Sequence, residues 1–290
     1  MLHYKEGDSM NKITIEARGK INLAIDVTNK RENGYHDVEM ILQEVNLADR
    51  ISLTLRQDGK ILVDSDNSSI PNTEDNLAVR AAKLFLTRLG RSEGVDIFLK
   101  KRIPVGAGMG GGSADAAGVL KGLNAMFGAP FSTKQLMEMG TALGADVPFC
   151  VLGGCALAEG IGEILTPLPM PPALKCVIAK PEPSVSTKWV YENLDYTKKP
   201  EHLSVSAVAE GIRNGDLATI CQNAGNILEN VTIPIYPVVG WIKEAFANAG
   251  AVLSLMSGSG SAVFGLFRTA EDAAHGAELA KQYADDIFIL

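Results

Sequence analysis

Alternating hydrophobic and polar positions predict strands in the first half of the chain, and apolar residues at helical spacing predict helices between them. The alternation is typical of half-buried strands in three segments, residues 13–17, 51–55 and 95–99. The short apolar segment 149–152 is expected to be a further strand, and Gly160-Ile161-Gly162 the turn of a hairpin.

Residues that favour helix ends stand between these strands. Asn76 can cap a helix that Gly90 ends, and Ser132 with Gln135 forms a capping box at the start of another. Ser113 is expected to cap a third helix, because apolar residues recur at helical spacing after it.

A proline-rich segment, 167–172, separates the two halves, since its prolines favour extended chain. Beyond it the pattern predicts strands at 176–179, 252–256, 262–267 and 287–290. Helices are expected at about 186–194, 205–213, 217–229, 236–249 and 271–283. Without the extra helices this is the β-α-β-β-α-β order of a ferredoxin-like sandwich. We therefore predict two domains, residues 1–166 and 167–290.

Composition narrows the possible partners. The chain has 290 residues, 46% hydrophobic and 21% charged, as in an ordinary globular protein. A net charge of −7 argues against nucleic acid or an anionic membrane surface as partner, and no stretch reads as a membrane span or signal peptide. Organised pattern begins just after Met10, which makes Met10 an alternative start. The four cysteines lack metal or disulfide spacing, which indicates reduced thiols in a cytoplasmic protein.

The segment 104–118 reads Pro-Val-Gly-Ala-Gly-Met-Gly-Gly-Gly-Ser-Ala-Asp-Ala-Ala-Gly and is the most unusual in the chain. Five glycines in seven positions before a predicted helix suit an anion site, where backbone N–H groups and the helix dipole hold a phosphate. An ordinary glycine-rich turn is the alternative. No Lys precedes Ser113, which excludes a Walker loop. Gly-x-Gly-x-x-Gly is present, but the acidic residue of a dinucleotide fold is missing. The basic residues 100–102 could add positive charge beside the loop.

Four other places carry candidate chemistry. Lys20 and Asn22 share one face of a strand-like segment, which suggests either a polar cavity wall or protection of an edge strand. Asp146 stands at a turn, where an Asp is either catalytic or a local hydrogen-bonding residue. The turn 33–36 holds an aromatic ring and an imidazole, and the flexible turn 258–260 is of a kind that closes over anions.

Taken together, these segments resemble the GHMP small-molecule kinases over about residues 13–288. The resemblance rests on six segments: 17–23, 33–37, 104–118, 143–149, 159–163 and 256–264. It implies an α+β fold of two domains. Residues 1–166 would form an ATP-binding, ribosomal-protein-S5-like domain, and residues 167–290 a ferredoxin-like domain.

The resemblance also implies a reaction, the ATP-dependent phosphorylation of the 2-hydroxyl of 4-diphosphocytidyl-2-C-methyl-D-erythritol (CDP-methylerythritol) in non-mevalonate isoprenoid synthesis. Lys20 and Asp146 match the family's catalytic pair. The positions matching its ATP site are Pro104, Val105, Gly106, Ala107, Gly108, Met109, Gly110, Gly111, Gly112, Ser113, Ala114, Lys101, Asn76 and Asp115. Those matching the cytidine end of its substrate site are Asn22, Tyr35, His36 and Tyr191.

Two positions depart from the family pattern, in which the glycine loop commonly continues Ser-Ser-Asn. Ala114 lacks the second hydroxyl, and Asp115 adds a negative charge in what is expected to be the first helical turn. We expect Mg²⁺ with ATP, held by protein ligands that the sequence does not identify, and a monomer or weak dimer. The alternatives are a homoserine- or mevalonate-type kinase, or a nucleotide-binding module without catalysis. The turn at 33–36 argues against the first, and the presence of Lys20 and Asp146 against the second.

Overall fold

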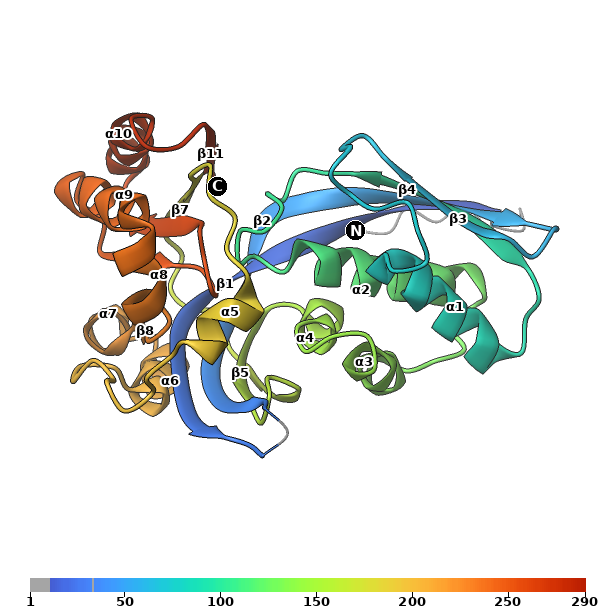
Figure 1. Cartoon of the computed structure of the whole chain (residues 1–290), viewed down its shortest axis with the longest axis horizontal. Helices are drawn as coiled ribbons and strands as arrows, with labels where there is room; N and C mark the ends of the chain where they lie inside the picture. Colours follow the sequence, from blue (N-terminus) through green and yellow to red (C-terminus); the bar gives the residue numbers. More distant parts are fainter. Residues whose placement is uncertain (1–10, 33) are drawn as a thin grey trace. The chain divides into compact units, whose positions relative to one another are not determined.

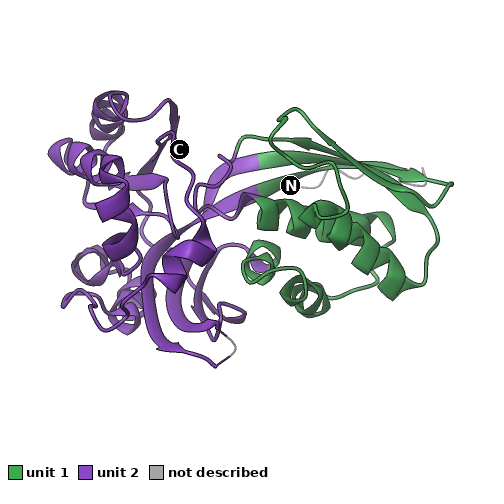
Figure 2. Cartoon of the chain, viewed as in Figure 1, with its two compact units in different colours: residues 1–17, 49–102, 112–151 green, residues 18–48, 103–111, 152–290 purple. Residues whose placement is uncertain are grey.

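The computed structural model describes residues 11–32 and 34–290, so Met10 and Asn33 lie outside the described residues. The chain forms two compact units built from non-consecutive segments (Figure 2). Unit 1 consists of Met1–Ala17, Asp49–Arg102 and Gly112–Val151, and unit 2 of Arg18–Ala48, Ile103–Gly111 and Leu152–Leu290. Strands β1 (Lys12–Lys30) and β2 (His36–Arg56) supply residues to both. The domain boundary after residue 166 stays a prediction.

Unit 1 places helices on a sheet. Beside its parts of β1 and β2 it contains β3 (Ile61–Ser65), β4 (Gly94–Lys100), α1 (Leu77–Leu89), α2 (Gly111–Met126), α3 (Thr133–Thr141) and α4 (Val147–Leu152). Strand β4 runs antiparallel to β2 and parallel to β3. In Figure 1 the helices α1, α2 and α3 lie on one side of β3 and β4. A Cβ on Gly118 would lie 2.4 Å from Cδ1 of Ile51, so glycine lets α2 approach the strands closely.

The sequence correctly predicts three strands of unit 1 and the caps at Asn76, Gly90 and Ser132. The three alternating segments are strands, and most of their apolar residues are buried, whereas Ile13, Ile15 and Leu55 are half-buried. The side chain of Asn76 accepts a hydrogen bond from Ala78 N, and Gly90 ends α1 in the left-handed conformation. The capping box of Ser132 and Gln135 is present at the start of α3.

Two expectations about unit 1 are wrong. Segment 149–152 belongs to helix α4, where Pro148 occupies the first turn and needs no N–H donor there. A short apolar run does not distinguish a strand from a buried helix, which explains the error. Ser113 is the third residue of α2, since that helix begins at Gly111.

Unit 2 contains a four-stranded antiparallel sheet in the order β11-β7-β10-β9, which confirms the ferredoxin-like arrangement. Its strands are β7 (Lys175–Lys180), β9 (Leu253–Met256), β10 (Val263–Phe267) and β11 (Asp286–Ile289). Helices α9 (Pro237–Asn248) and α10 (Ala270–Ala280) lie side by side (Figure 1). Phe246 of α9 and Phe267 of β10 meet edge to face, with ring centroids 5.9 Å apart.

The remaining elements of unit 2 are β5 (Cys155–Glu159), β6 (Ile164–Leu168), α5 (Thr187–Glu192), α6 (Val205–Asn214), α7 (Leu217–Asn223), β8 (Gly225–Asn226) and α8 (Glu229–Ile235). Strands β5 and β6 form the predicted hairpin. The helix predicted at 217–229 is interrupted, because Ala224 is extended and Gly225-Asn226 pairs with β1 as strand β8. That tertiary pairing has no signature in the local sequence.

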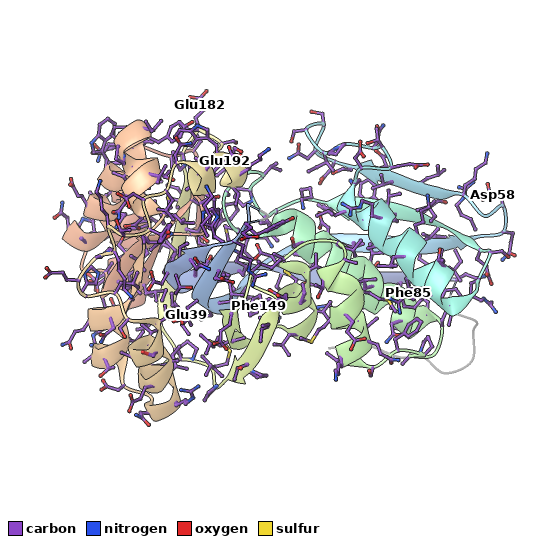
Figure 3. All side chains as sticks on the ribbon, turned by 60° about the horizontal axis from the view of Figure 1, so that its bottom comes forward. Glu39, Asp58, Phe85, Phe149, Glu182 and Glu192 are labelled. Atoms are coloured by element: carbon purple, nitrogen blue, oxygen red, sulfur yellow. The ribbon has the colours of Figure 1, made fainter. Side chains whose placement is uncertain are left out.

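Side chains follow the expected division between core and surface. Phe85 and Phe149 are at most 1% exposed, and Figure 3 shows them among neighbouring side chains, whereas Asp58 lies at the margin. Across the described residues, every helix is too short or too polar to cross a membrane.

Candidate functional site

The glycine loop, residues 104–112, adopts a backbone that requires its glycines. Gly106, Gly108 and Gly110 have φ values of 64°, 73° and 71°, a region that other residues rarely occupy. At Gly108 a Cβ would also lie only 1.9 Å from the carbonyl oxygen of Ser257. Any other residue at position 108 would therefore push the two loops of unit 2 apart.

Hydrogen bonds hold the carbonyl side of the glycine loop. Its bonded carbonyls and their donors are Ala107 O with Ala262 N (3.3 Å), Gly108 O with Ser257 Oγ (3.1 Å) and Met109 O with Lys20 N (3.0 Å). By contrast, within residues 11–32 and 34–290 the N–H groups of Gly106, Gly108, Met109 and Gly110 donate to no protein acceptor. A loop anchored by its carbonyls and left with unused N–H groups is suited to bind an anion.

Lys20 lies on β1 beside this loop. The residue is only 4% exposed, and its Nζ donates to Asn22 Oδ1 over 2.9 Å. The same Oδ1 accepts from Gly258 N at 3.1 Å, and Asn22 Nδ2 approaches Met40 Sδ at 3.7 Å. Sequence analysis expects Asn22 at the substrate, and the structure shows that its amide also links Lys20 to the loop 257–261. Lys20 and Asn22 therefore form a polar cluster in the interior of unit 2.

Three residues that the sequence analysis missed hold the serine loop, residues 257–261. Asn226 is 2% exposed, and its Nδ2 donates to Met256 O and Gly258 O, each at 2.8 Å. Thr232 Oγ1 donates to Ser259 O at 3.1 Å, and Glu229 Oε1 accepts from Met256 N at 2.8 Å. Asn226 belongs to β8, and Glu229 and Thr232 belong to α8, whereas the sequence predicts one helix at 217–229 and no element at 230–235.

His36 and Tyr191, both in unit 2, lie together as the resemblance suggests. Their ring centroids are 5.3 Å apart, with 39° between the ring planes. His36 is 7% exposed, and burial together with the positive charge of Lys30 lowers the pKa of its imidazole. Tyr35, by contrast, is 59% exposed. The pair offers aromatic surface beside a ring that stays neutral at neutral pH.

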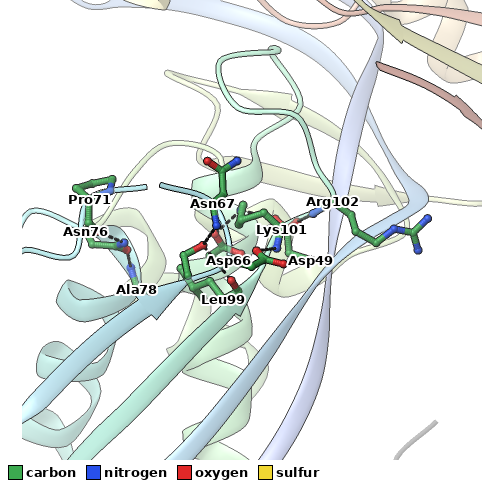
Figure 4. A network of polar contacts seen from close by, with 11 residues as sticks. Asp49, Asp66, Asn67, Pro71, Asn76, Ala78, Leu99, Lys101 and Arg102 are labelled. Atoms are coloured by element: carbon green, nitrogen blue, oxygen red, sulfur yellow. Dashed lines mark hydrogen bonds and ion pairs between the residues drawn. The ribbon is translucent and has the colours of Figure 1, made fainter. Parts of the chain in front are cut away.

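Unit 1 carries the other predicted nucleotide residues. Figure 4 shows Asn76 at the start of α1, where Nδ2 donates to Pro71 O at 2.7 Å while Oδ1 caps the helix. Lys101 forms ion pairs with Asp49 and Asp115, and Nζ lies 2.5 Å from Asp115 Oδ2. All three side chains are at most 4% exposed. The charge of Lys101 is therefore used inside unit 1.

The triad of Asp49, Lys101 and Asp115 holds one positive charge between two carboxylates. Burial, with a smaller contribution from the charge of Asp49, raises the pKa of Asp115 to about 7 against the opposing charge of Lys101. Burial alone would lower the pKa of Lys101, but the two carboxylates outweigh it and raise that pKa. The sequence suggested that Asp115 lies in the first turn of the helix, but it lies in the second turn of α2. Its charge is paired with that of Lys101.

Asp146 belongs to unit 1, at the turn that starts α4. Val147 N donates to Gly144 O and Cys150 N donates to the carbonyl oxygen of Asp146, so Asp146 precedes the helix as its cap residue does. Its side chain is half-buried. Lys20, the other residue of the predicted catalytic pair, belongs to unit 2. The surroundings of the two residues are therefore described separately.

Metal-ligating side chains do not gather in the part of the chain that the structure describes. Outside residues 1–10 and 33, no three His, Cys, Asp or Glu side chains are grouped as a metal site. The four cysteines are free thiols, and three of them are buried.

Family comparisons agree with this geometry. The model of the GHMP kinases N terminal domain matches residues 76–154, and that of the GHMP kinases C terminal domain matches residues 208–285. The 4-diphosphocytidyl-2-C-methyl-D-erythritol kinases of Alkaliphilus metalliredigens and Lachnoclostridium phytofermentans are 45% and 47% identical to the chain, each match covering 89% of both chains. A crystal structure of 4-(cytidine 5'-diphospho)-2C-methyl-D-erythritol kinase superposes with a TM-score of 0.78 and 35% identity, covering 96% of this chain and 98% of that one. The chain therefore belongs to the GHMP kinase family.

Proposed function

We propose that this chain transfers the γ-phosphoryl group of ATP to the 2-hydroxyl of CDP-methylerythritol. As a GHMP kinase the chain is an ATP-using small-molecule kinase, and its relatives named for this substrate are up to 47% identical over most of their length. The observation that carries the proposal is the glycine loop, whose carbonyls are bonded to protein while four of its N–H groups have no acceptor among residues 11–32 and 34–290. A homoserine or mevalonate acceptor is the alternative that the test below must exclude.

The glycine loop would hold the phosphates of ATP. Phosphoryl transfer needs positioning and stabilisation of the charge on the transferred group, and unused N–H groups supply both. Helix α2 follows the loop directly, so the positive end of its dipole adds to the attraction. Asn76, Lys101 and Asp115 would shape the nucleotide end of the site from unit 1. In this role Lys101 would act through its ion pairs.

Mg²⁺ would enter with ATP. The described residues hold no cluster of three acidic or imidazole ligands, and Mg²⁺ in kinases is commonly held by one or two protein groups and by substrate phosphates. Ser113 in the first turn of α2 offers a hydroxyl, whereas Ala114 cannot. The ion would neutralise charge on the phosphates.

Lys20 and Asp146 would act on the acceptor alcohol. Asp146 would orient the 2-hydroxyl and accept its proton as oxygen attacks phosphorus, while Lys20 would stabilise negative charge that develops on that oxygen. The transferred proton then resides on the Asp146 carboxyl group and leaves to solvent. His36 and Tyr191, with Tyr35 and Asn22, would receive the cytidine end. The cysteine pattern supports a cytoplasmic enzyme, with domains at residues 1–166 and 167–290.

The test is an ATP-consumption assay of the full chain with CDP-methylerythritol, mevalonate and homoserine as acceptors. We expect turnover with the first alone. Asp146→Asn and Lys20→Ala should each lower kcat by roughly two to four decades, the range of a general acid–base contribution. Lys188→Ala, at an 86% exposed side chain, is the matched control. Preference for mevalonate or homoserine would refute the substrate, and near wild-type kcat would remove that residue from the mechanism.

A further inference from the structure

Lys180, the last residue of β7, is a buried lysine that the site described above does not use. The residue is 8% exposed, and burial lowers the pKa of its ammonium group, although the charges of Asp286 and Glu182 oppose this. Its Nζ donates to Pro181 O at 2.6 Å and to Glu182 O at 3.2 Å. In the part of the chain that the structure describes, the ammonium group forms no ion pair. Because a buried charge is costly, its presence here points to a role in ordering these two carbonyls.

The segment that follows Lys180 depends on such an anchor. Residues 181–184 form no helix or strand, and Pro181 and Pro183 have no N–H group with which to fix the backbone. Lys180 donates to the first two carbonyls of this segment, and Ser261 Oγ donates to the third, Pro183 O. Two side chains, one from β7 and one from the serine loop, therefore set the path of the segment.

Segment 181–187 contacts both the glycine loop and the serine loop. A Cβ on Gly106 would lie 3.0 Å from Ser184 Oγ, so Ser184 lies directly against the glycine loop. The hydroxyl groups of Thr187 and Ser259 are hydrogen-bonded at 2.8 Å, and the serine loop in turn bonds to the glycine loop. The segment therefore reaches the glycine loop by two routes, directly and through the serine loop.

We propose that Lys180 is a positioning residue for ATP: it fixes segment 181–184, which holds the glycine loop in the conformation that receives the phosphates. This inference rests on the proposed function, in that the glycine loop binds ATP. A loop whose N–H groups are already aligned binds more tightly than one that is ordered on binding, because ordering costs conformational entropy. Lys180 acts through the segment and does not touch ATP or the acceptor.

The test compares Lys180→Met with Lys180→Arg in the full chain, and Lys175→Met, at the exposed start of the same strand, is the matched control. Isothermal titration with Mg²⁺ and ATP gives Kd without an acceptor, and steady-state assays with CDP-methylerythritol give kcat and both KM values. Lys180→Met should raise Kd and KM for ATP by about tenfold, while kcat and the KM for the acceptor change by less than about threefold. Lys180→Arg should restore most of the affinity, since its guanidinium group also donates to carbonyls.

Ser261→Ala removes the donor to Pro183 O and tests the same segment independently. It should raise Kd for ATP by about threefold or more. The double variant Lys180→Met/Ser261→Ala should lose less than the sum of the two single effects, because both act through one segment. Circular dichroism checks that each variant is folded, and Ser261→Ala decides if Lys180→Met does not fold.

The outcomes separate this inference from the proposed function. An unchanged Kd for ATP in folded Lys180→Met, even with a lowered Tm, would overturn the positioning role, and so would fully additive effects in the double variant. An unchanged Kd in Ser261→Ala would do the same if Lys180→Met does not fold. A wild-type chain that binds ATP but does not phosphorylate CDP-methylerythritol would refute the proposed function and leave the comparison of Kd values intact. Absence of ATP binding by the wild-type chain would overturn both.

Discussion

Replacement of Lys101 by Met tests the buried triad of unit 1. The Lys101 side chain is 4% exposed and lies beside Asp49 (Figure 4). It also pairs with Asp115, and the two carboxylate side chains are 0% and 4% exposed. Met keeps most of the side-chain volume but leaves two buried carboxylates without a counter-charge. Removal of one partner from a buried ion pair costs about 3–5 kcal/mol, a large share of the 5–15 kcal/mol that stabilises a typical domain.

The cost should depend on pH in a definite direction. The pKa of Asp115, about 7, lies above its ordinary value of 3.8, so its contribution to stability is full below 3.8 and is lost as pH rises through 7. The raised pKa of Lys101 keeps that group charged throughout this range. In Lys101→Met, protonation of Asp115 removes one of the two unpaired charges. The penalty should therefore be larger at pH 8 than at pH 6.

Urea unfolding followed by far-UV circular dichroism measures the penalty. The chain has two Trp residues, Trp189 and Trp241, and both belong to unit 2, so tryptophan fluorescence would not report on unit 1. Hydrogen exchange of residues 111–126 gives a local readout for α2. Lys188→Met is the exposed control, and Lys101→Met/Asp115→Asn should recover part of the loss at pH 8. A penalty below about 1 kcal/mol, or one equal at both pH values, would refute the reasoning.

Three further substitutions test the loops and a helix cap. Gly108→Ala should raise KM for ATP by about tenfold or more, because the left-handed backbone alone costs about 1–2 kcal/mol and the added Cβ meets Ser257 O; an unchanged KM would contradict this. Asn226→Leu should lower kcat and stability together, since each of two carbonyls loses its donor at about 1–3 kcal/mol, and a wild-type unfolding curve would argue against this role. Asn76→Ala should lower Tm by about 2–4 °C through loss of about 1 kcal/mol of capping, with Ser132→Ala as a comparison in α3.

Local chemistry explains why much of the fold can be predicted. The Asn76 cap joins atoms two residues apart, and the Ser132 box spans three, so both are visible in a short stretch of sequence. The ferredoxin-like order of unit 2 follows from the succession of strands and helices, because short connections restrict how such elements pair. The glycine loop is likewise predictable, since only glycine tolerates its backbone.

The failures of prediction fall where a segment is too short to show a period, or where a distant segment decides its structure. Segment 149–152 has too few residues for its period to distinguish helix from strand. The predicted helix 217–229 breaks because Gly225 and Asn226 find a partner in β1, two hundred residues earlier. Asn226 then bonds to carbonyls 30 and 32 residues away, which no local pattern encodes.

By itself, the sequence determined the glycine loop, the caps at Asn76 and Ser132, the strand order of the ferredoxin-like sheet and the motifs that resemble a kinase family, because each of these depends on residues close together in the chain. Only the tertiary structure decided that Lys101 pairs with two carboxylates, that of Asp115 and that of Asp49, which lies 52 residues earlier in the chain. The register that pairs Arg50 of β2 with Lys100 of β4 brings these groups together. Strand register depends on packing of the whole sheet, so the charge environment of Lys101 follows from the fold and not from its neighbours in sequence.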